Sequence, residues 1–229
     1  MREMKKLLKI ATSLTLIGGI FVSGNIVSAN TDGIQQSPPP PPPPPDIMLE
    51  FDDLANDHWA YNEIMNLVYH RIMYGYGNGK FGVEDNITRE QAAAVLHRAL
   101  NLKRSPFEEN PYGDISGKST MFPYEILHLT SLGIFKGDEN GNFRPKATLT
   151  RAELAQILTK AYTLKAKHPH TFTDILENYW ARDAISALQS NKVVVGTGDG
   201  KFEPEMLVTR GQFAKFLQQA IYNSPGKWE

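Results

Sequence analysis

Three arginines occupy the same point of a recurring motif, and their type and position suit anion chemistry. Arg89, Arg151 and Arg210 each follow a threonine in the segments ITREQ (87–91), LTRAE (149–153) and VTRGQ (208–212). The motif predicts a helix start, where a cation is mildly unfavourable beside the positive end of the helix dipole. A guanidinium beside free backbone N–H groups would nevertheless receive a carboxylate or a phosphate. The alternative is a solvated arginine paired with a nearby aspartate; recurrence at three equivalent positions favours the anion site.

The threonine of each motif is a predicted helix cap. Thr88, Thr150 and Thr209 each precede a Gln or Glu by three positions and are followed by an apolar, Ala-rich run. This is the pattern of a capping box, in which the two side chains each accept a bond from a backbone N–H group at the helix start. We expect helices from Thr88 to about Leu102, from Thr150 to about Leu164 and from Thr209 to Tyr222.

Two further landmarks recur in step with the arginine motif. Glycine-rich loops precede it at GYGNGKF (75–81), GDENGNF (137–143) and GTGDGKF (196–202). Still earlier come FDDL (51–54), YGDI (112–115) and FTDI (172–175). Three landmarks in register at a period near 60 indicate a triplicated unit.

Each unit also carries a predicted helix before its glycine loop. In the first unit a helix from His58 to about Arg71 would be capped by Asn56 or Asp57, with apolar residues at helical spacing. Tyr124 to Leu129 mark the corresponding helix of the second unit, and Trp180 to Leu188 that of the third. The sequence therefore predicts an all-α fold of three helix-loop-helix repeats, 48–105, 106–167 and 168–229. Because one repeat has too little core to be stable alone, we expect the three to close into a pseudo-threefold bundle.

The first 47 residues lie outside the repeats. Residues 1–29 read as a secretory signal peptide, with a basic start, a short apolar run and Ala29 at the cleavage point. Residues 30–47 form a polyproline linker with eight consecutive prolines. No later stretch could span a bilayer, and without the signal peptide the chain is net acidic, which gives no reason to expect nucleic acid. Cysteine is absent, so disulfides and thiolate metal sites are excluded. We expect no metal and no cofactor.

The order of motifs in the third repeat, FTDI, YWARDAI, GTGDGKFEP and VTRGQ, resembles the S-layer homology domain, and the other two repeats are similar to it. The resemblance covers Phe51 to about Tyr222. It implies a three-pronged all-α spindle with a central helix bundle. It also implies binding to the secondary polysaccharide linked to peptidoglycan in Gram-positive walls, commonly through a terminal N-acetylmannosamine with a pyruvate ketal. The ligand sites of such proteins lie in grooves between repeats, with the motif arginine as a chief ligand residue, which gives Arg89, Arg151 and Arg210.

The resemblance suggests further site residues. A pyruvate ketal keeps a carboxylate, which is the group that an arginine at a helix start would receive. Trp59 and Trp180 would stack on a sugar face at a groove rim, or else be core residues in the first turn of their helices. Gly75, Gly137 and Gly196 would let backbone N–H groups approach the ligand, or else permit a positive φ in a turn. The second repeat has Phe122-Pro123 where the others carry Trp-Ala, so we expect a weaker groove there.

We therefore expect a secreted, non-catalytic module that is held non-covalently in the cell wall or S-layer of a Gram-positive bacterium, with S-layer proteins as further candidate partners. No zincin, nucleophile-elbow or paired-carboxylate signature appears, and the repeats fill nearly all of the expected mature chain. The loop at Asp138 departs from an EF-hand in the position of its glycine and in its last ligand. The alternative that stays open is a structural module that self-associates or docks a protein without glycan specificity.

Overall fold

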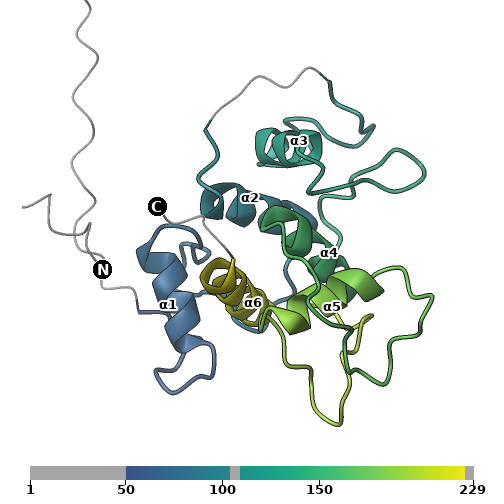
Figure 1. Ribbon diagram of the computed structural model, residues 1–229. Coiled ribbons are helices and arrows are strands. Elements are labelled where there is room, and N and C mark those ends of the chain that lie inside the picture. Colours follow the sequence, from purple (N-terminus) through teal and green to yellow (C-terminus); the bar gives the residue numbers. More distant parts are fainter. Residues whose placement is uncertain (1–49, 104–108, 225–229) are drawn as a thin grey trace, which may run out of the picture. The chain divides into compact units, whose positions relative to one another are not determined.

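The computed structural model describes residues 50–103 and 109–224; the predicted signal peptide and polyproline linker lie outside them. The described residues form six α-helices and isolated β-bridges, without a strand, so the all-α prediction is confirmed (Figure 1). Each repeat contributes two helices. They are α1 (Tyr61–Tyr69), α2 (Arg89–Ala99), α3 (Pro123–Ser131), α4 (Arg151–Ala161), α5 (Arg182–Ser190) and α6 (Arg210–Asn223).

The second helix of every repeat starts as predicted. Thr88, Thr150 and Thr209 are the N-caps of α2, α4 and α6, and each closes a complete capping box with the Gln or Glu three positions later. An N-cap of this kind is worth about 1 kcal/mol. The motif arginine is the first helical residue in all three cases. These helices end three residues earlier than predicted in the first two repeats and one residue later in the third.

Two of the three first helices, α1 and α5, begin later than predicted. The N-cap of α1 is Ala60, which makes no side-chain cap, so the prediction that Asn56 or Asp57 caps this helix was wrong. Trp59 and Trp180 consequently lie just before α1 and α5 rather than inside their first turns. In α3 the N-cap is Phe122, at the position that an alanine holds in the other two repeats. Met121 therefore stands where the other repeats have a tryptophan. The sequence comparison that placed Phe122 opposite the tryptophans was therefore wrong by one residue.

An aspartate ties each glycine loop to the start of its own repeat. Both carboxylate oxygens of Asp174 accept backbone N–H groups, from Phe202 at 2.9 Å and Glu203 at 2.7 Å. Asp53 and Asp114 hold the corresponding loops in the first and second repeats. This explains the aspartate in the third position of FDDL, YGDI and FTDI. The buried loop aromatics, Phe81, Phe143 and Phe202, follow directly from this anchoring.

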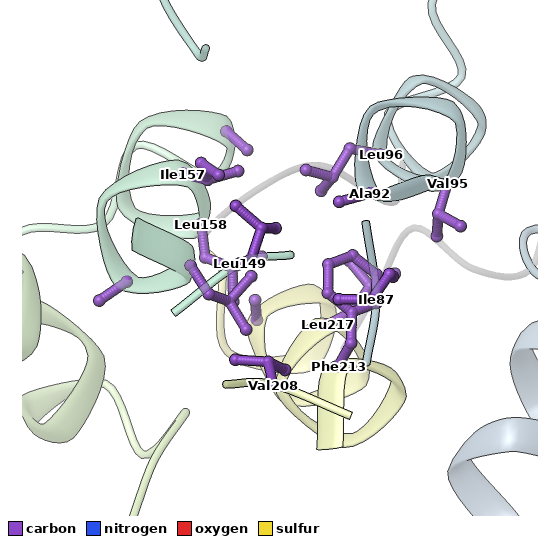
Figure 2. Close-up of a cluster of buried hydrophobic side chains, with 14 of the residues drawn as sticks. Ile87, Ala92, Val95, Leu96, Leu149, Ile157, Leu158, Val208, Phe213 and Leu217 are labelled. Carbon is purple, nitrogen blue, oxygen red and sulfur yellow. The ribbon is translucent and has the colours of Figure 1, made fainter. Parts of the chain in front are cut away.

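The three repeats meet in a closed ring of backbone hydrogen bonds. Ile87 N–H donates to Val208, Val208 N–H donates to Leu149, and Leu149 N–H donates to Ile87, at 2.9, 2.9 and 3.2 Å. The side chains of these three residues are fully buried and lie among residues of α2, α4 and α6, which converge on the same cluster (Figure 2). Burying an aliphatic side chain contributes roughly 1.5 to 3 kcal/mol, so this shared core joins repeats that could not stand alone.

Outer helices pack between repeats rather than within them. The contacting pairs are α2 with α3, α4 with α5, and α6 with α1, so each second helix covers the first helix of the following repeat. The cyclic order explains why three copies suffice to bury every apolar helix face. The pseudo-threefold spindle itself stays a prediction.

Candidate functional site

Two grooves of the same design lie at the repeat boundaries. The Arg89 groove has a volume of about 510 Å³ and is lined by Arg89, Ile134 to Gly137, Arg144, residues of α4 and Trp180. The Arg151 groove is larger, about 850 Å³, and is lined by Arg151, Lys192 to Thr197, Glu203, Met206, residues of α6 and Trp59. Each groove combines a motif arginine from one repeat with the glycine loop and second helix of the next repeat and a tryptophan from the remaining one. The sequence predictions for arginine, tryptophan and glycine thus converge on common grooves in two of three cases.

The motif arginines are buried, at 3 to 5% exposure, and each reaches into the following repeat. The Nε atoms of Arg89, Arg151 and Arg210 donate to the carbonyl oxygens of Phe143, Phe202 and Phe81 at 2.8, 2.7 and 3.0 Å. Each guanidinium also lies over the ring of the same phenylalanine, 4.6 to 4.7 Å from its centroid. The arginine therefore clamps two repeats together before any ligand is considered.

The backbone N–H groups at the helix starts are not free. The first two N–H groups of α4, those of Arg151 and Ala152, donate to the carbonyls of Met206 and Pro204, both at 2.9 Å. The equivalent groups of α2 and α6 bond to the loops of the second and first repeats, and the capping threonine takes the third N–H group. The expectation of a guanidinium beside free helix N–H groups is wrong in this respect, because inter-repeat packing uses them.

The three arginines differ in what their remaining nitrogen atoms bind. Nη2 of Arg89 donates to the carbonyl of Lys136 at 2.7 Å, and Nη2 of Arg210 to that of Tyr74, also at 2.7 Å. In the Arg151 groove the equivalent residue is Val195, but Nη2 of Arg151 is buried and has no partner among the described residues. Gly196, directly after Val195, has a φ of +91°, whereas the φ of Gly75 and of Gly137 is not positive. The loop of the third repeat therefore follows a different path, and Val195 is 90% exposed.

The counter-ions of the grooves differ as well. Glu153, the capping-box residue of α4, lies in the Arg89 groove with Oε1 3.7 Å from Nη1 of Arg89 and 3.9 Å from Nη2 of Arg144. The equivalent residue in the Arg151 groove is the neutral Gln212. Arg151 thus has no adjacent carboxylate of this kind. Both grooves are basic overall, the first through Lys136 and Lys160 and the second through Lys192 and Lys215.

Burial lowers the pKa of all three arginines, because a charged guanidinium is poorly solvated there. Glu153 opposes this effect at Arg89, whereas the acidic side chains that oppose it at Arg151 are Glu203 and Asp174. A buried charge with few partners is costly unless an opposite charge joins it. Arg151 is the motif arginine with the fewest hydrogen bonds to the described residues, which makes it the first candidate receptor for an external anion.

The tryptophans lie at the groove rims. Trp59 is 49% exposed and Trp180 is 55% exposed, which contradicts the alternative that they are core residues. Nζ of Lys215 lies 5.3 Å from the centroid of Trp59, and Gln156 donates to the backbone carbonyl of Trp180. An exposed indole face beside a cation is a suitable platform for a sugar that carries an anion.

Glycine is required before each loop for a steric reason. A Cβ atom on Gly137 would lie 2.5 Å from the ring of Tyr112, and one on Gly75 or Gly196 would lie 2.5 or 2.8 Å from the matching ring of its repeat. The positive-φ explanation therefore applies to Gly196 alone among the three. Gly137 and Gly196 line the two grooves, and a role for their N–H groups in binding stays a prediction.

The third arginine lies in a site that the protein fills with its own side chains. Arg210 is held between the rings of Tyr76 and Phe81, and the hydroxyl of Tyr76 donates to Asp85 at 2.9 Å. Arg98, which corresponds to Lys160 and Gln219 in the grooves, lies over the ring of Tyr74 and donates to the carbonyl of Ile72. We call this arrangement the Arg210 site.

Sequence reasoning missed several groove residues. Lys192, Lys215 and Gln219 of the Arg151 groove and Lys136 and Lys160 of the Arg89 groove vary from repeat to repeat, so the recurring motif did not reveal them. For Lys160, Lys215 and Gln219, the helical spacing from the capping-box residue was the available signal. Position 153 is followed at the next turns by 156, 157 and 160, and position 212 by 215, 216 and 219.

Among residues 50–103 and 109–224 no helix is long and apolar enough to cross a membrane, and no three His, Cys, Asp or Glu side chains are arranged to hold a metal ion.

Comparison with known proteins identifies the repeats. Residues 50–93, 111–155 and 171–214, more than half of the chain, match the model of the S-layer homology domain. The chain is 32% identical over 171 residues to an S-layer protein of Bacillus licheniformis and 33% identical over 172 residues to S-layer protein EA1 of Bacillus anthracis. These matches cover 73% of this chain and 19% of each relative, so the chain spans about a fifth of their length. A Bacillus anthracis protein named an uncharacterized cell wall amidase is 30% identical over 173 residues, which is 74% of this chain and 31% of that protein. The chain belongs to the S-layer homology domain family.

Proposed function

We propose that the protein is a non-catalytic module of the bacterial cell wall or S-layer, which anchors non-covalently by binding an acidic polysaccharide linked to peptidoglycan. The observation that carries the proposal is the state of Arg151. It is 3% exposed, lines a groove of about 850 Å³, and keeps a buried Nη2 without a partner among the described residues. A carboxylate fixed on a sugar, such as a pyruvate ketal on N-acetylmannosamine, would supply the missing acceptor and the missing charge.

The surroundings of Arg151 support a sugar acid over a bare ion. Trp59 and Lys215 line the same groove, where an aromatic face and an ammonium group lie together. Gln212 and Gln219 add neutral groups that can exchange hydrogen bonds with sugar hydroxyls. A mostly pre-formed groove with a few convergent polar groups is the usual form of a small-ligand site.

The relatives support location at the cell surface. The two S-layer proteins and the cell wall amidase are named for the surface and the wall, and each matches over about three quarters of this chain. The region that they share with this chain is the repeat region, which supports an anchoring role rather than the amidase chemistry of one relative. Two grooves on a wall covered with polymer would also bind with avidity, so retention would exceed the affinity of either groove.

Co-sedimentation with purified Gram-positive cell walls tests the proposal. We expect the protein to sediment with intact walls, to stay in solution after mild acid removes the secondary polymer, and to be retained less when Arg151 is replaced. Arg151→Met keeps the bulk of the side chain, and the loss of a charge-assisted contact of about 1.5 to 3 kcal/mol predicts a tenfold to hundredfold weaker groove. Equal sedimentation with stripped walls would overturn the proposal and favour a protein-docking or self-associating module.

A further inference from the structure

The two grooves share their architecture but present different atoms to a ligand, and one of the differences is the capping-box residue. In a capping box the third residue must accept the N–H group of the cap, which Glu153 does through Oε2 at 2.9 Å and Gln212 through Oε1 at 3.2 Å. Either residue closes a complete capping box. The second atom of each planar group is then free to face the groove.

In the Arg89 groove that second atom is an acceptor. Oε1 of Glu153 faces Nη1 of Arg89 and Nη2 of Arg144, so the protein itself places a carboxylate beside its arginine. The remaining donors of Arg89 that are described here go to the carbonyls of Phe143 and Lys136. The positive charge left in this groove belongs chiefly to Lys136 and Lys160, which carry no counter-ion among the described residues. Burial and the neighbouring Lys136 both lower the pKa of Lys160, which agrees with two ammonium groups close together.

In the Arg151 groove the second atom is a donor. Because Oε1 of Gln212 accepts the cap N–H group, the amide Nε2 is left for the groove. Gln212 and Arg151 therefore both present donors to this groove, in which Glu203 supplies a carboxylate. Two donors in one groove, one of them charged, match the two oxygens of a carboxylate.

We propose that the capping-box residue sets ligand specificity: Gln212 makes the Arg151 groove selective for a carboxylate-bearing sugar, and Glu153 denies that selectivity to the Arg89 groove. This inference rests on the proposed function and names the determinant within it. The Arg89 groove attracts anions through mobile ammonium groups, so its binding is weak, salt-sensitive and indifferent to the geometry of the anion. The Arg210 site has Gln91 at the equivalent position, but Nε and Nη2 of Arg210 both donate to carbonyl oxygens. Selectivity for a carboxylate therefore has a second requirement, a guanidinium nitrogen that no carbonyl oxygen of the protein already binds.

The two tryptophans allow each groove to be followed separately. Trp59 belongs to the Arg151 groove and Trp180 to the Arg89 groove, so their indole N–H signals in a ¹⁵N-labelled protein report the two sites, with Trp59→Phe and Trp180→Phe for assignment. The probes are N-acetylmannosamine with a pyruvate ketal and the methyl ester of the same compound, which has the same shape without the charge. The matched variants are Gln212→Glu and Glu153→Gln, each of which installs a residue that already closes a capping box in this protein.

In the native protein we expect the Trp59 signal to respond to the acid at least tenfold more tightly than to the ester, and the Trp180 signal to show no such preference. Gln212→Glu should weaken the Trp59 response to the acid by roughly tenfold to a hundredfold, because the introduced carboxylate would pair with Arg151 and repel the ligand. Glu153→Gln should create a preference for the acid at Trp180. Thermal unfolding of both variants should match the native protein, because the capping box is preserved.

The outcomes separate this inference from the proposed function. If the acid shifts both tryptophans with the same preference over the ester, and the two substitutions change neither, the capping-box residue does not set specificity although the protein still binds the sugar. If neither probe moves either signal while the protein sediments with walls, both the carboxylate site and its determinant are rejected. A preference at Trp59 that survives Gln212→Glu also overturns the inference.

Discussion

The Arg151 groove and the Arg210 site contain the same motif arginine, but the two arginines differ in their hydrogen bonds and in the side chains around them. Arg210 donates to the carbonyls of Phe81 and Tyr74, lies between two aromatic rings, and has Arg98 packed over Tyr74 nearby. Arg151 makes one of these two carbonyl bonds, and its loop carries the exposed Val195 instead of an aromatic residue. The motif alone therefore does not make a binding site. Under the proposed function, the residues around the loop glycine would decide whether the arginine is a structural clamp or a receptor.

The largest expected effect of this contrast is on stability. Arg210→Met keeps the bulk but leaves two carbonyl oxygens without a donor, and each unpaired buried group costs about 1 to 3 kcal/mol. We expect a loss of about 2 to 6 kcal/mol in the free energy of unfolding. Arg151→Met removes one such bond and also removes a poorly compensated buried charge, so its change should stay within about 1 kcal/mol.

Urea unfolding at neutral pH measures both variants under the same conditions. The m value should be unchanged, because neither substitution alters the surface exposed on unfolding. Equal losses in the two variants would mean that the arginines share one structural role, and the contrast between groove and clamp would fail.

A second prediction concerns a feature that the two sites share, the aspartate that holds the loop. Burial alone would raise the pKa of Asp53 and of Asp174, but bonds from the backbone N–H groups of Phe81 and Phe202 and of the residues after them hold both pKa values below the ordinary 3.8. Asp53→Asn and Asp174→Asn should each cost about 1.5 to 3 kcal/mol at pH 7, the range for hydrogen bonds to a charged group.

The lowered pKa fixes the sign of the pH dependence. The carboxyl holds its proton less tightly in the folded protein than in the unfolded chain. Its contribution to the free energy of unfolding is therefore complete above the ordinary pKa and is lost as the pH falls through the pKa of the folded state. The native protein should therefore be more stable than both asparagine variants at neutral pH, and this difference in the free energy of unfolding should disappear below about pH 4. Urea unfolding between about pH 3 and pH 7 checks this. A cost at Asp53 much larger than that at Asp174 would show that loop anchoring, and not the arginine environment, distinguishes the closed site from the open groove.

The recurring features of the fold could be predicted from the sequence, because a repeated motif exposes what every repeat needs. The capping threonines, the glycine loops and the second helices were all predicted by local rules that need no partner. The starts of the first helices were not, because α1, α3 and α5 have no side-chain cap and each packs against the second helix of the preceding repeat.

The candidate site was predictable only in part. The groove position of Arg151 and Trp59 follows from which repeat contacts which, and that order depends on long-range bonds such as the ring through Ile87. The use of the helix N–H groups by neighbouring loops could not be read from a single repeat. Lys215 and Gln219 were missed because the differences between repeats, which a repeat comparison treats as noise, are what distinguish one groove from the other.

The smallest expected effect is on sugar affinity when one of the two groove tryptophans, Trp59 or Trp180, is replaced. Trp59 is half-exposed at the rim of the Arg151 groove with Lys215 over its ring, so its loss should remove stacking and leave the guanidinium in place. Such a contact is worth about 0.5 to 1.5 kcal/mol, so Trp59→Ala should weaken binding of the pyruvylated sugar roughly threefold to tenfold. Trp180→Ala, at the Arg89 groove, is the matched control and should leave this affinity unchanged. Titration calorimetry with the free sugar measures both. If Trp180→Ala weakens the acid-selective binding as much as Trp59→Ala does, the carboxylate is held in both grooves and the distinction between them is lost.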